Sequence, residues 1–302
     1  MRDDVPEPIV MGVVNVTPDS FSDGGLWLDP AAAIAHGYEL VAQGAHIVDV
    51  GGESTRPGAE QVSEAEELRR VLPVLEGLEH AGARLSIDTS KAAVARAAVE
   101  AGATIVNDVT ALRADPDMAA VVGGGANGCD VCILTLMHMR GEPRTMQDDP
   151  QYDDVVSDVK AFLEERMAFA VAEGVDEERI WLDPGIGFGK TIDHNLELLA
   201  RLDEIVALGR PVVVGTSRKS FLGTIAGGRE PGRRVPGTIA TNVLALERGA
   251  RVFRVHDVEE AHDALLVAAA TLRGRWDPAT TTSTTTSSTT TSTTTTPASR
   301  PS

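Results

Sequence analysis

The feature that most constrains the fold is a repeated pattern, a short apolar run that ends abruptly in polar residues or glycine. Seven segments show it clearly, at 11–15, 47–52, 85–89, 104–108, 181–185, 212–216 and 252–257. Runs that are apolar throughout are typical of parallel strands covered on both faces. Polar residues at the ends of such strands gather at one end of a (β/α)8 barrel, where the active sites of that fold lie. The pattern therefore predicts a TIM barrel whose functional residues stand at the strand ends.

Segments with helical periodicity separate these runs, and an apolar run at 131–137 supplies the fifth of eight strands. The helical segments lie at about 29–43, 63–80, 90–101, 115–122, 151–173, 192–207, 236–248 and 257–272. Asp29 and Ser63 stand where helix N-caps are expected. Six glycines follow helices as candidate left-handed caps: Gly44, Gly82, Gly102, Gly174, Gly209 and Gly249. Eight strands alternating with eight helices is the count that a closed barrel needs.

The chain divides into one large domain and a tail of different composition. Residues 1–278 are predicted to form a single barrel domain, because a chain of 302 residues with 42% hydrophobic residues can bury a full core. Residues 279–302 are dominated by Thr and Ser. Such a segment has no apolar surface to offset the entropy lost on ordering. It is predicted to be a disordered tail.

The charge of the chain excludes several classes of partner. The net charge of −18 argues against binding nucleic acid or an anionic membrane, because phosphate binding needs clustered Lys and Arg. An anion must therefore be held by a local basic site. The acidic start and the absence of any apolar run of about 18 residues predict a cytoplasmic protein with no membrane partner.

Two motifs suggest functions that their spacing does not support. Cys129 and Cys132 form a lone C-x-x-C, and no second pair exists to complete a zinc site, so we interpret them as structural. The stretch 185–191 contains G-x-G-x-G-K-T. It is one residue short of the spacing of a phosphate-binding P-loop and begins after a strand-terminal Asp-Pro, which argues against ATP or GTP hydrolysis.

The first two strand exits continue into loops with functional composition. Residues 15–25 are too long and too rich in hydroxyl and carboxylate groups for a simple turn, and two glycines end them. Loops of this kind above a barrel often act as mobile covers. Residues 51–58 combine glycines, hydroxyls and Arg56, the composition expected of an anion clamp.

Four residues at other strand exits form the most discriminating set: Asp88, Asn107, Asp183 and Lys219. Pointing inward together, they would present acceptors, an amide and a cation to one planar ligand. Carboxylates suit a guanidine-like edge and the lysine suits a carbonyl, which describes a pterin. A single Asp at a strand end can equally be a helix cap, and for Asp88 or Asp108 alone we weigh the two interpretations evenly.

The last strand exit carries Arg254 and His256, which are two positions apart and so face the same side of a strand. Together with Asn15 and Arg56 they could hold a polyphosphate with Mg²⁺, which prefers oxygen ligands and retained water. His138 follows the fifth strand among methionines. We interpret it as a packing residue rather than a catalytic one.

Taken together, these motifs resemble the dihydropteroate synthase family. They are 15–25 (NVTPDSFSDGG), 52–58 (GESTRPG), 88–89 (DT), 107–108 (ND), 183–190 (DPGIGFGK), 215–221 (GTSRKSF) and 254–258 (RVHDV). The resemblance spans about residues 8–272 and leaves only the tail outside. It implies a pterin-binding (β/α)8 barrel, typically a homodimer.

The resemblance also implies the reaction, which is a step of folate synthesis: 6-hydroxymethyl-7,8-dihydropterin diphosphate is joined to 4-aminobenzoate and diphosphate is released. Asp88, Asp183, Lys219 and Arg254 would be catalytic. The resemblance assigns the pterin to Asp88, Asn107, Asp183 and Lys219, the diphosphate to Asn15, Arg254 and His256, and Mg²⁺ to Asn15. It assigns 4-aminobenzoate to Thr55, Arg56, Pro57, Phe188 and Ser220, and a mobile loop to Phe21 and Asp23.

Two alternatives remain open at this point. A pterin-dependent methyltransferase of the same superfamily would keep a pterin site, but would not need the Arg56 loop, the 217–220 turn and the Arg254/His256 pair together. The second alternative is a catalytically silent pterin-binding paralogue. The presence of Asn15, Lys219 and His256 argues against it without excluding it.

Overall fold

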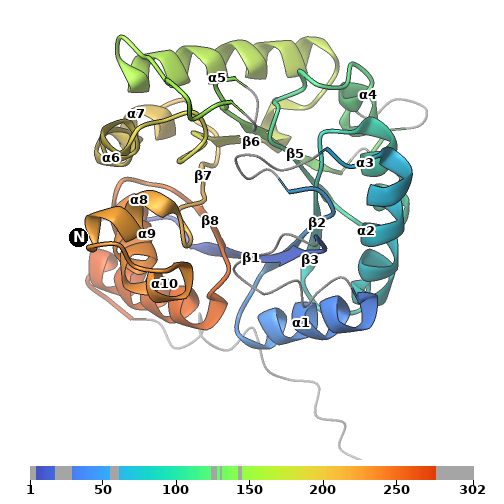
Figure 1. The fold of residues 1–302 in the computed structure, drawn as a ribbon, viewed down its shortest axis with the longest axis horizontal. Helices are drawn as coiled ribbons and strands as arrows, with labels where there is room; N and C mark the ends of the chain where they lie inside the picture. Colours follow the sequence, from blue (N-terminus) through green and yellow to red (C-terminus); the bar gives the residue numbers. More distant parts are fainter. Residues whose placement is uncertain are drawn as a thin grey trace, which may run out of the picture.

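Eight parallel strands form the centre of the computed structural model, which describes residues 5–17, 29–54, 61–123, 128–129, 131–141 and 145–276 (Figure 1). The strands are β1 (Ile9–Asn15), β2 (Ile47–Gly51), β3 (Arg84–Asp88), β4 (Ile105–Asp108), β5 (Ile133–Met137), β6 (Ile180–Asp183), β7 (Val213–Val214) and β8 (Val252–Val255). Their order in the sheet is β6-β5-β4-β3-β2-β1-β8-β7. A parallel bridge between Leu182 and Val212 joins the two edges of this sheet. The predicted TIM barrel is confirmed.

Helices surround the barrel (Figure 1), and each predicted helical segment contains at least one, whereas the short helix at 220–225 was not predicted. They are α1 (Pro30–Ala42), α2 (Glu64–Leu78), α3 (Ala92–Glu100), α4 (Met118–Val122), α5 (Val155–Ala172), α6 (Ile192–Ala200), α7 (Leu202–Val206), α8 (Ser220–Ile225), α9 (Val235–Glu247) and α10 (Val258–Arg273). Two short 3-10 helices, η2 (Glu177–Arg179) and η3 (Pro231–Arg233), complete the set. The expected caps are present, since Asp29 accepts from the backbone N–H of Ala31 and Ser63 from that of Glu66.

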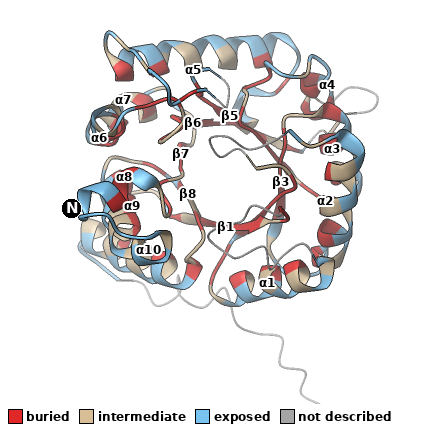
Figure 2. Ribbon diagram, in the orientation of Figure 1, coloured by how far each residue is buried: buried red, intermediate tan, exposed pale blue. Residues whose placement is uncertain are grey.

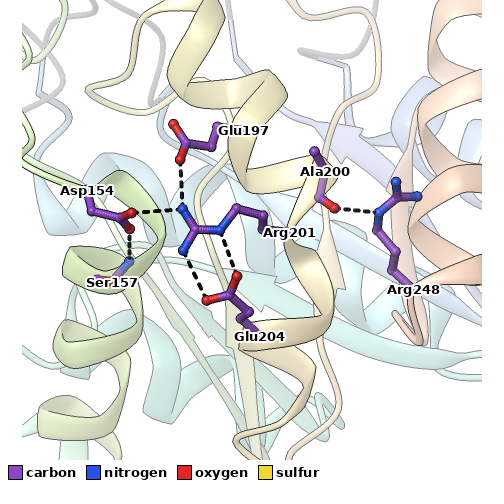
Figure 3. A network of polar contacts seen from close by, with 7 residues as sticks. All are labelled: Asp154, Ser157, Glu197, Ala200, Arg201, Glu204 and Arg248. Atoms are coloured by element: carbon purple, nitrogen blue, oxygen red, sulfur yellow. Dashed lines mark hydrogen bonds and ion pairs between the residues drawn. The ribbon is translucent and has the colours of Figure 1, made fainter.

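The predicted helix at 192–207 was wrong in one respect, because Arg201 divides it into α6 and α7 (Figure 3). Arg201 leaves the helical conformation with φ −112°. Its guanidinium donates to Glu197 at 2.7 Å, to Glu204 at 2.7 and 3.1 Å, and to Asp154 at 2.8 Å. Asp154 is the N-cap of α5, so this network holds three helix ends together. Its carboxylates raise the pKa of Arg201 above the ordinary value.

The core has two parts on either side of the strands. Side chains that point outward from the barrel pack against the inner faces of the helices, which Figure 2 shows as the buried faces. A smaller cluster lies inside the barrel and consists of Met11, Ile47, Ile105, Trp181, Val213 and Val252. These residues lie toward the amino-terminal ends of their strands and fill that half of the barrel.

Other sequence expectations have mixed outcomes. All six glycines interpreted as caps have positive φ, from 81° at Gly209 to 103° at Gly44. Cys132 is fully buried as expected, but Cys129 and Cys132 form a disulfide, which the sequence reasoning had not considered. None of the described helices combines the length and the apolar character needed to cross a membrane. The predicted tail at 279–302 lies outside the described residues.

Candidate active site

A cavity of about 710 Å³ lies at the carboxyl-terminal ends of the barrel strands. Seven of the residues singled out from the sequence line it: Asn15, Asp88, Phe188, Lys219, Ser220, Arg254 and His256. Asn107 and Asp183 are buried and are not among the lining residues. Phe21, Asp23, Thr55, Arg56 and Pro57 lie outside the described residues. The ends of β1, β3 and β8 and the loops after β6 and β7 therefore line one cavity, while two of the four discriminating residues lie outside its lining.

A network of buried carboxylates around the partly buried Arg254 crosses the barrel at one side of this cavity. From β8, Arg254 donates through Nε to Asp49 Oδ2 at 2.6 Å and through Nη2 to Asp88 Oδ2 at 2.8 Å. Asn107 donates through Nδ2 to the same Asp49 oxygen at 3.3 Å. Asp88 and Asn107 are direct neighbours in the register of β3 and β4. Arg254 thus connects β8 with β2 and β3.

Sequence reasoning missed Asp49, which has no exposed surface and is the common partner of Arg254 and Asn107. It stands two positions after Ile47, which faces the barrel interior, so Asp49 faces inward as well. The sequence signal that could have identified Asp49 is a single carboxylate within the otherwise apolar run 47–50. Its other oxygen, Oδ1, is buried without a hydrogen-bond partner among the described residues.

Burial changes the acidity of this network. It raises the pKa of Asp88 to about 7, although the charge of Arg254 opposes the shift. The nearby carboxylates of Asp49 and Asp108 reinforce it. Burial alone would lower the pKa of Arg254, but Asp49 and Asp88 raise it above the ordinary value. The guanidinium therefore stays charged, while Asp88 can exchange its proton near neutral pH.

Asp183 and Lys219 form the other half of the site. Asp183 Oδ1 accepts from the backbone N–H of Gly185 at 2.7 Å. Lys219 Nζ donates to the carbonyl of Ile186 and lies 4.2 Å from the centre of the Phe188 ring. Burial raises the pKa of Asp183, and the charges of Lys219 and Arg254 oppose that rise. Burial lowers the pKa of Lys219 to about 7, against the attraction of Asp183.

These electrostatic interactions place the four discriminating residues around Arg254. Asp88 is bonded to it directly, and Asn107 is connected to it through Asp49. Asp183 and Lys219 interact electrostatically with Arg254 and with each other. The set offers carboxylate and amide oxygens together with two cations, the donors and acceptors that one flat polar heterocycle would need.

The turn before α8 holds Lys219 and Ser220 in place. Arg218 has φ 57°, a left-handed conformation that costs a non-glycine residue about 1 to 3 kcal/mol. Its guanidinium binds both oxygens of Asp257, at 2.6 and 3.0 Å. Its backbone N–H donates to Thr238 at 3.2 Å, and its carbonyl accepts from Arg234 at 2.8 Å. These contacts offset the strain and connect the ends of β7 and β8.

Two smaller groups support neighbouring parts of the site. Ser217 Oγ accepts from the backbone N–H of His256 at 3.1 Å and lies 3.0 Å from its Nδ1. Lys91 binds Glu53, which lines the cavity, and the fully buried Glu67 at 2.5 Å. The start of the second loop is therefore anchored to α2 and α3. No local sequence pattern indicated the contact between Ser217 and His256 or the ion pairs of Lys91.

Comparison with known proteins identifies the family. The family model of pterin binding enzymes matches residues 11–256. Dihydropteroate synthase of Escherichia coli (strain K12) is 45% identical over 273 residues, which cover 90% of this chain and 94% of that protein. The chain belongs to the dihydropteroate synthases. It is therefore a transferase, and the resemblance of its motifs to this family is confirmed.

Solved structures of dihydropteroate synthase agree with the fold. The Xanthomonas albilineans enzyme with 4-aminobenzoic acid is 48% identical and superposes with a TM-score of 0.80. The same enzyme in complex with 7,8-dihydropteroate has a TM-score of 0.77 at 45% identity. Each comparison covers 88% of this chain and 94% of the other.

Proposed function

We propose that the cavity at the carboxyl end of the barrel is where this transferase joins 6-hydroxymethyl-7,8-dihydropterin diphosphate to 4-aminobenzoate, releasing diphosphate in folate biosynthesis. The observation that carries the proposal is the grouping of Asp88, Asn107, Asp183 and Lys219 around Arg254. The complexes of the Xanthomonas relative with 4-aminobenzoic acid and with 7,8-dihydropteroate support the same pair of substrates.

The pterin is assigned to the deep part of the site. Asp88, Asn107 and Asp183 receive its guanidine-like edge, and Lys219 donates to its carbonyl. Arg254 lies against the ring, since it spans the interior between β8 and β3. A hydrogen bond to a charged group contributes about 1.5 to 3 kcal/mol. Several such bonds select a pterin over an apolar ring of the same size.

The same residues promote the reaction. The bond between the pterin methylene and the diphosphate oxygen breaks, and positive charge spreads into the ring. The buried carboxylates of Asp88 and Asp183 stabilise that charge, while Arg254 and His256 stabilise the departing anion. The neutral aromatic amine then attacks the methylene from the opposite side. An arylamine loses its proton readily after the bond forms, so no dedicated general base is required.

The aminobenzoate is assigned to the outer part of the cavity, which Phe188 and Ser220 line. Thr55, Arg56 and Pro57 would complete this pocket, and Phe21 and Asp23 would belong to a loop that covers it. Phe188 offers a ring face for the substrate ring, and Arg56 offers a charge for its carboxylate.

A magnesium ion fits the donors of this site. Asn15, Thr17 and Ser54 all line the cavity, and each of these side chains carries an oxygen that can bind Mg²⁺. The described residues contain no group of three or more His, Cys, Asp or Glu side chains that could hold a metal alone. Mg²⁺ usually takes one or two protein ligands and completes its shell with water and substrate phosphate. Asn15 would hold the ion, which when bound neutralises diphosphate charge.

We also propose that the enzyme is a homodimer and acts in the cytoplasm. Leu244 on α9 and Val267 on α10 are 48% and 68% exposed, beside an outer groove between these helices. A second copy covering this face would bury them. The pterin diphosphate is highly charged and cannot cross a membrane unaided, which favours the cytoplasm. Sedimentation of Val267→Glu against the unmodified chain tests the dimer, and an unchanged mass would contradict this surface.

The decisive experiment is reconstitution. Purified protein, Mg²⁺, the pterin diphosphate and labelled 4-aminobenzoate should yield labelled dihydropteroate, and chelation of the metal should slow its formation. Asp183→Asn should lower the rate strongly, whereas Asp203→Asn on the exposed surface of α7 should not. Failure of the unmodified protein to make product would contradict the proposal.

A further inference from the structure

The loop between β6 and α6 is held by an unusual set of hydrogen bonds. Five consecutive carbonyls, from Gly185 to Gly189, each accept from a side chain. Lys190 Nζ donates to Gly185 at 2.9 Å and Phe188 at 3.0 Å, Lys219 Nζ to Ile186, Gln147 Nε2 to Gly187 at 2.6 Å, and Tyr152 Oη to Gly189 at 2.8 Å. Such coverage means that side chains determine the shape of this loop.

The backbone of the loop explains why it needs these donors. Gly185, Gly187 and Gly189 have φ values of 65°, 83° and 62°. A Cβ at Gly185 would stand 1.8 Å from the carbonyl oxygen of His138, so no side chain fits there. Alternating left-handed residues turn successive carbonyls away from a regular ladder of backbone bonds. Buried carbonyls left unpaired would destabilise the loop.

Lys190 is the central donor. It is 3% exposed, and its Nζ lies 2.8 Å from His138 Nδ1 in addition to the two carbonyls. An ammonium group has three N–H bonds, and three acceptors surround it. Lys190 lines part of the cavity, yet all its donors are used by the loop and by His138. It therefore differs from the lysine of a P-loop, whose ammonium contacts phosphate.

His138 supplies the third acceptor. It is buried, and its ring packs edge-on against Phe162 at 4.9 Å, as the packing interpretation predicted. Burial lowers the pKa of His138 to about 2, and the charge of Lys190 adds to that effect. The imidazole is therefore neutral, and its Nδ1 can accept from the ammonium. The backbone N–H of His138 also donates to the Asp183 carbonyl at 2.9 Å, which joins the ends of β5 and β6. Burial lowers the pKa of Lys190 as well, but three acceptors around Nζ favour its protonated form.

We propose that Lys190 is a positioning residue that fixes the Gly185–Gly189 loop so that the Phe188 ring faces the aminobenzoate part of the cavity. The proposal rests on the proposed function of that cavity. Phe188 is only partly buried and packs against a small cluster that includes Met137 and Met146. Its own carbonyl is held by Lys190, so the lysine controls the backbone that carries the ring. Loss of this contact should weaken binding of the aromatic amine before it affects the pterin.

Lys190→Met tests the proposal in the full-length protein, because Met has a similar length and no donors. The KM for 4-aminobenzoate should rise about tenfold, as expected for the loss of hydrogen bonds to a charged group. The KM for the pterin diphosphate should change much less. Hydrogen exchange should accelerate in peptides covering 185–190 and stay unchanged in the barrel strands. Lys160→Met on the surface of α5, where the lysine side chain is 39% exposed, is the matched control.

Three outcomes would overturn the proposal. One is unchanged exchange in the 185–190 peptides, and another is a loss confined to kcat, which would make Lys190 part of the chemistry. If Lys190→Met does not fold, Tyr152→Phe removes one hydrogen-bond donor from the same loop. The KM of this variant for 4-aminobenzoate should rise by a smaller factor than that of Lys190→Met. An unchanged KM in Tyr152→Phe is the third outcome. Absence of turnover in the unmodified enzyme would contradict the proposed function instead, and the exchange measurement would still report on the loop.

Discussion

The two halves of the barrel interior differ in chemistry although the same strands build both. Toward the amino-terminal end the interior is apolar, with Ile47, Ile105, Trp181 and Val252 in one cluster. Two positions later on each strand stands a polar residue: Asp49, Asn107, Asp183 and Arg254. Residues two apart on a strand face the same side. Each of these four strands therefore contributes first to the core and then to the site.

This difference separates stability from function along each strand. The apolar half removes side chains from water and stabilises the fold. The polar half contains atoms with no hydrogen-bond partner among the described residues, namely Asp49 Oδ1, Ser86 Oγ and Thr135 Oγ1. A buried unsatisfied polar atom costs about 1 to 3 kcal/mol. Changes in the first half should lower stability, and changes in the second should lower affinity.

The largest effect is expected in the apolar half. Trp181→Ala should lower the free energy of unfolding by about 3 to 5 kcal/mol, because it leaves a cavity in the barrel interior. Urea denaturation measures this loss. Trp276→Ala is the control, since Trp276 is 69% exposed and its removal should change stability little. Equal effects of the two substitutions would contradict the assignment of Trp181 to the core.

Asp183→Ala, two positions further along β6, should lower affinity for the pterin more than it lowers stability. Affinity for the pterin should fall at least about tenfold, since a lost charged hydrogen bond is worth about 1.5 to 3 kcal/mol. The free energy of unfolding should fall far less than for Trp181→Ala, because burial already disfavours the charged carboxylate. Calorimetry with the pterin measures the affinity. An unchanged value would refute the role of Asp183.

The pH dependence of pterin binding should sharpen the comparison. Asp88 has a pKa raised to about 7 by burial, so its carboxylate is lost as the pH falls below that value. Lys219 has a pKa lowered to about 7 by burial, so its ammonium is lost as the pH rises above it. Affinity for 6-hydroxymethyl-7,8-dihydropterin should therefore peak near neutral pH and fall on each side by up to about tenfold per unit.

Lys219→Met separates the two limbs of that profile. It should weaken binding and remove the decline at alkaline pH, while the decline at acid pH remains. Calorimetry across the pH range measures both limbs. An alkaline decline that persists in Lys219→Met would show that another group is responsible for it.

The smallest effect is expected from the Thr- and Ser-rich tail. Truncation after Pro278 removes a segment whose composition leaves almost no apolar surface to bury on folding. Turnover and melting temperature should stay unchanged within error. A large loss of activity would show that the tail has a function.

The sequence predicted the barrel because each of its signals is local. Apolar runs, caps such as Ser63 and glycines such as Gly44 depend on residues a few positions away. Two local errors have a similar explanation. The ion pairs of Arg201 end α6 early, and α8 is a helix of six residues, too short to show a period. Tertiary contacts outweigh weak local preferences in such segments.

By itself, the sequence determined the number of strands, their order in the chain and the polar residues at their ends, because alternation and strand length are encoded locally. Only the tertiary structure decided which of those residues meet. Arg254 and Asp49 are 205 residues apart in the chain, and their pairing follows from closure of the barrel. The bonds of Arg218 to Asp257 and of Lys190 to His138 depend likewise on the ends of neighbouring strands, whose positions no local pattern specifies.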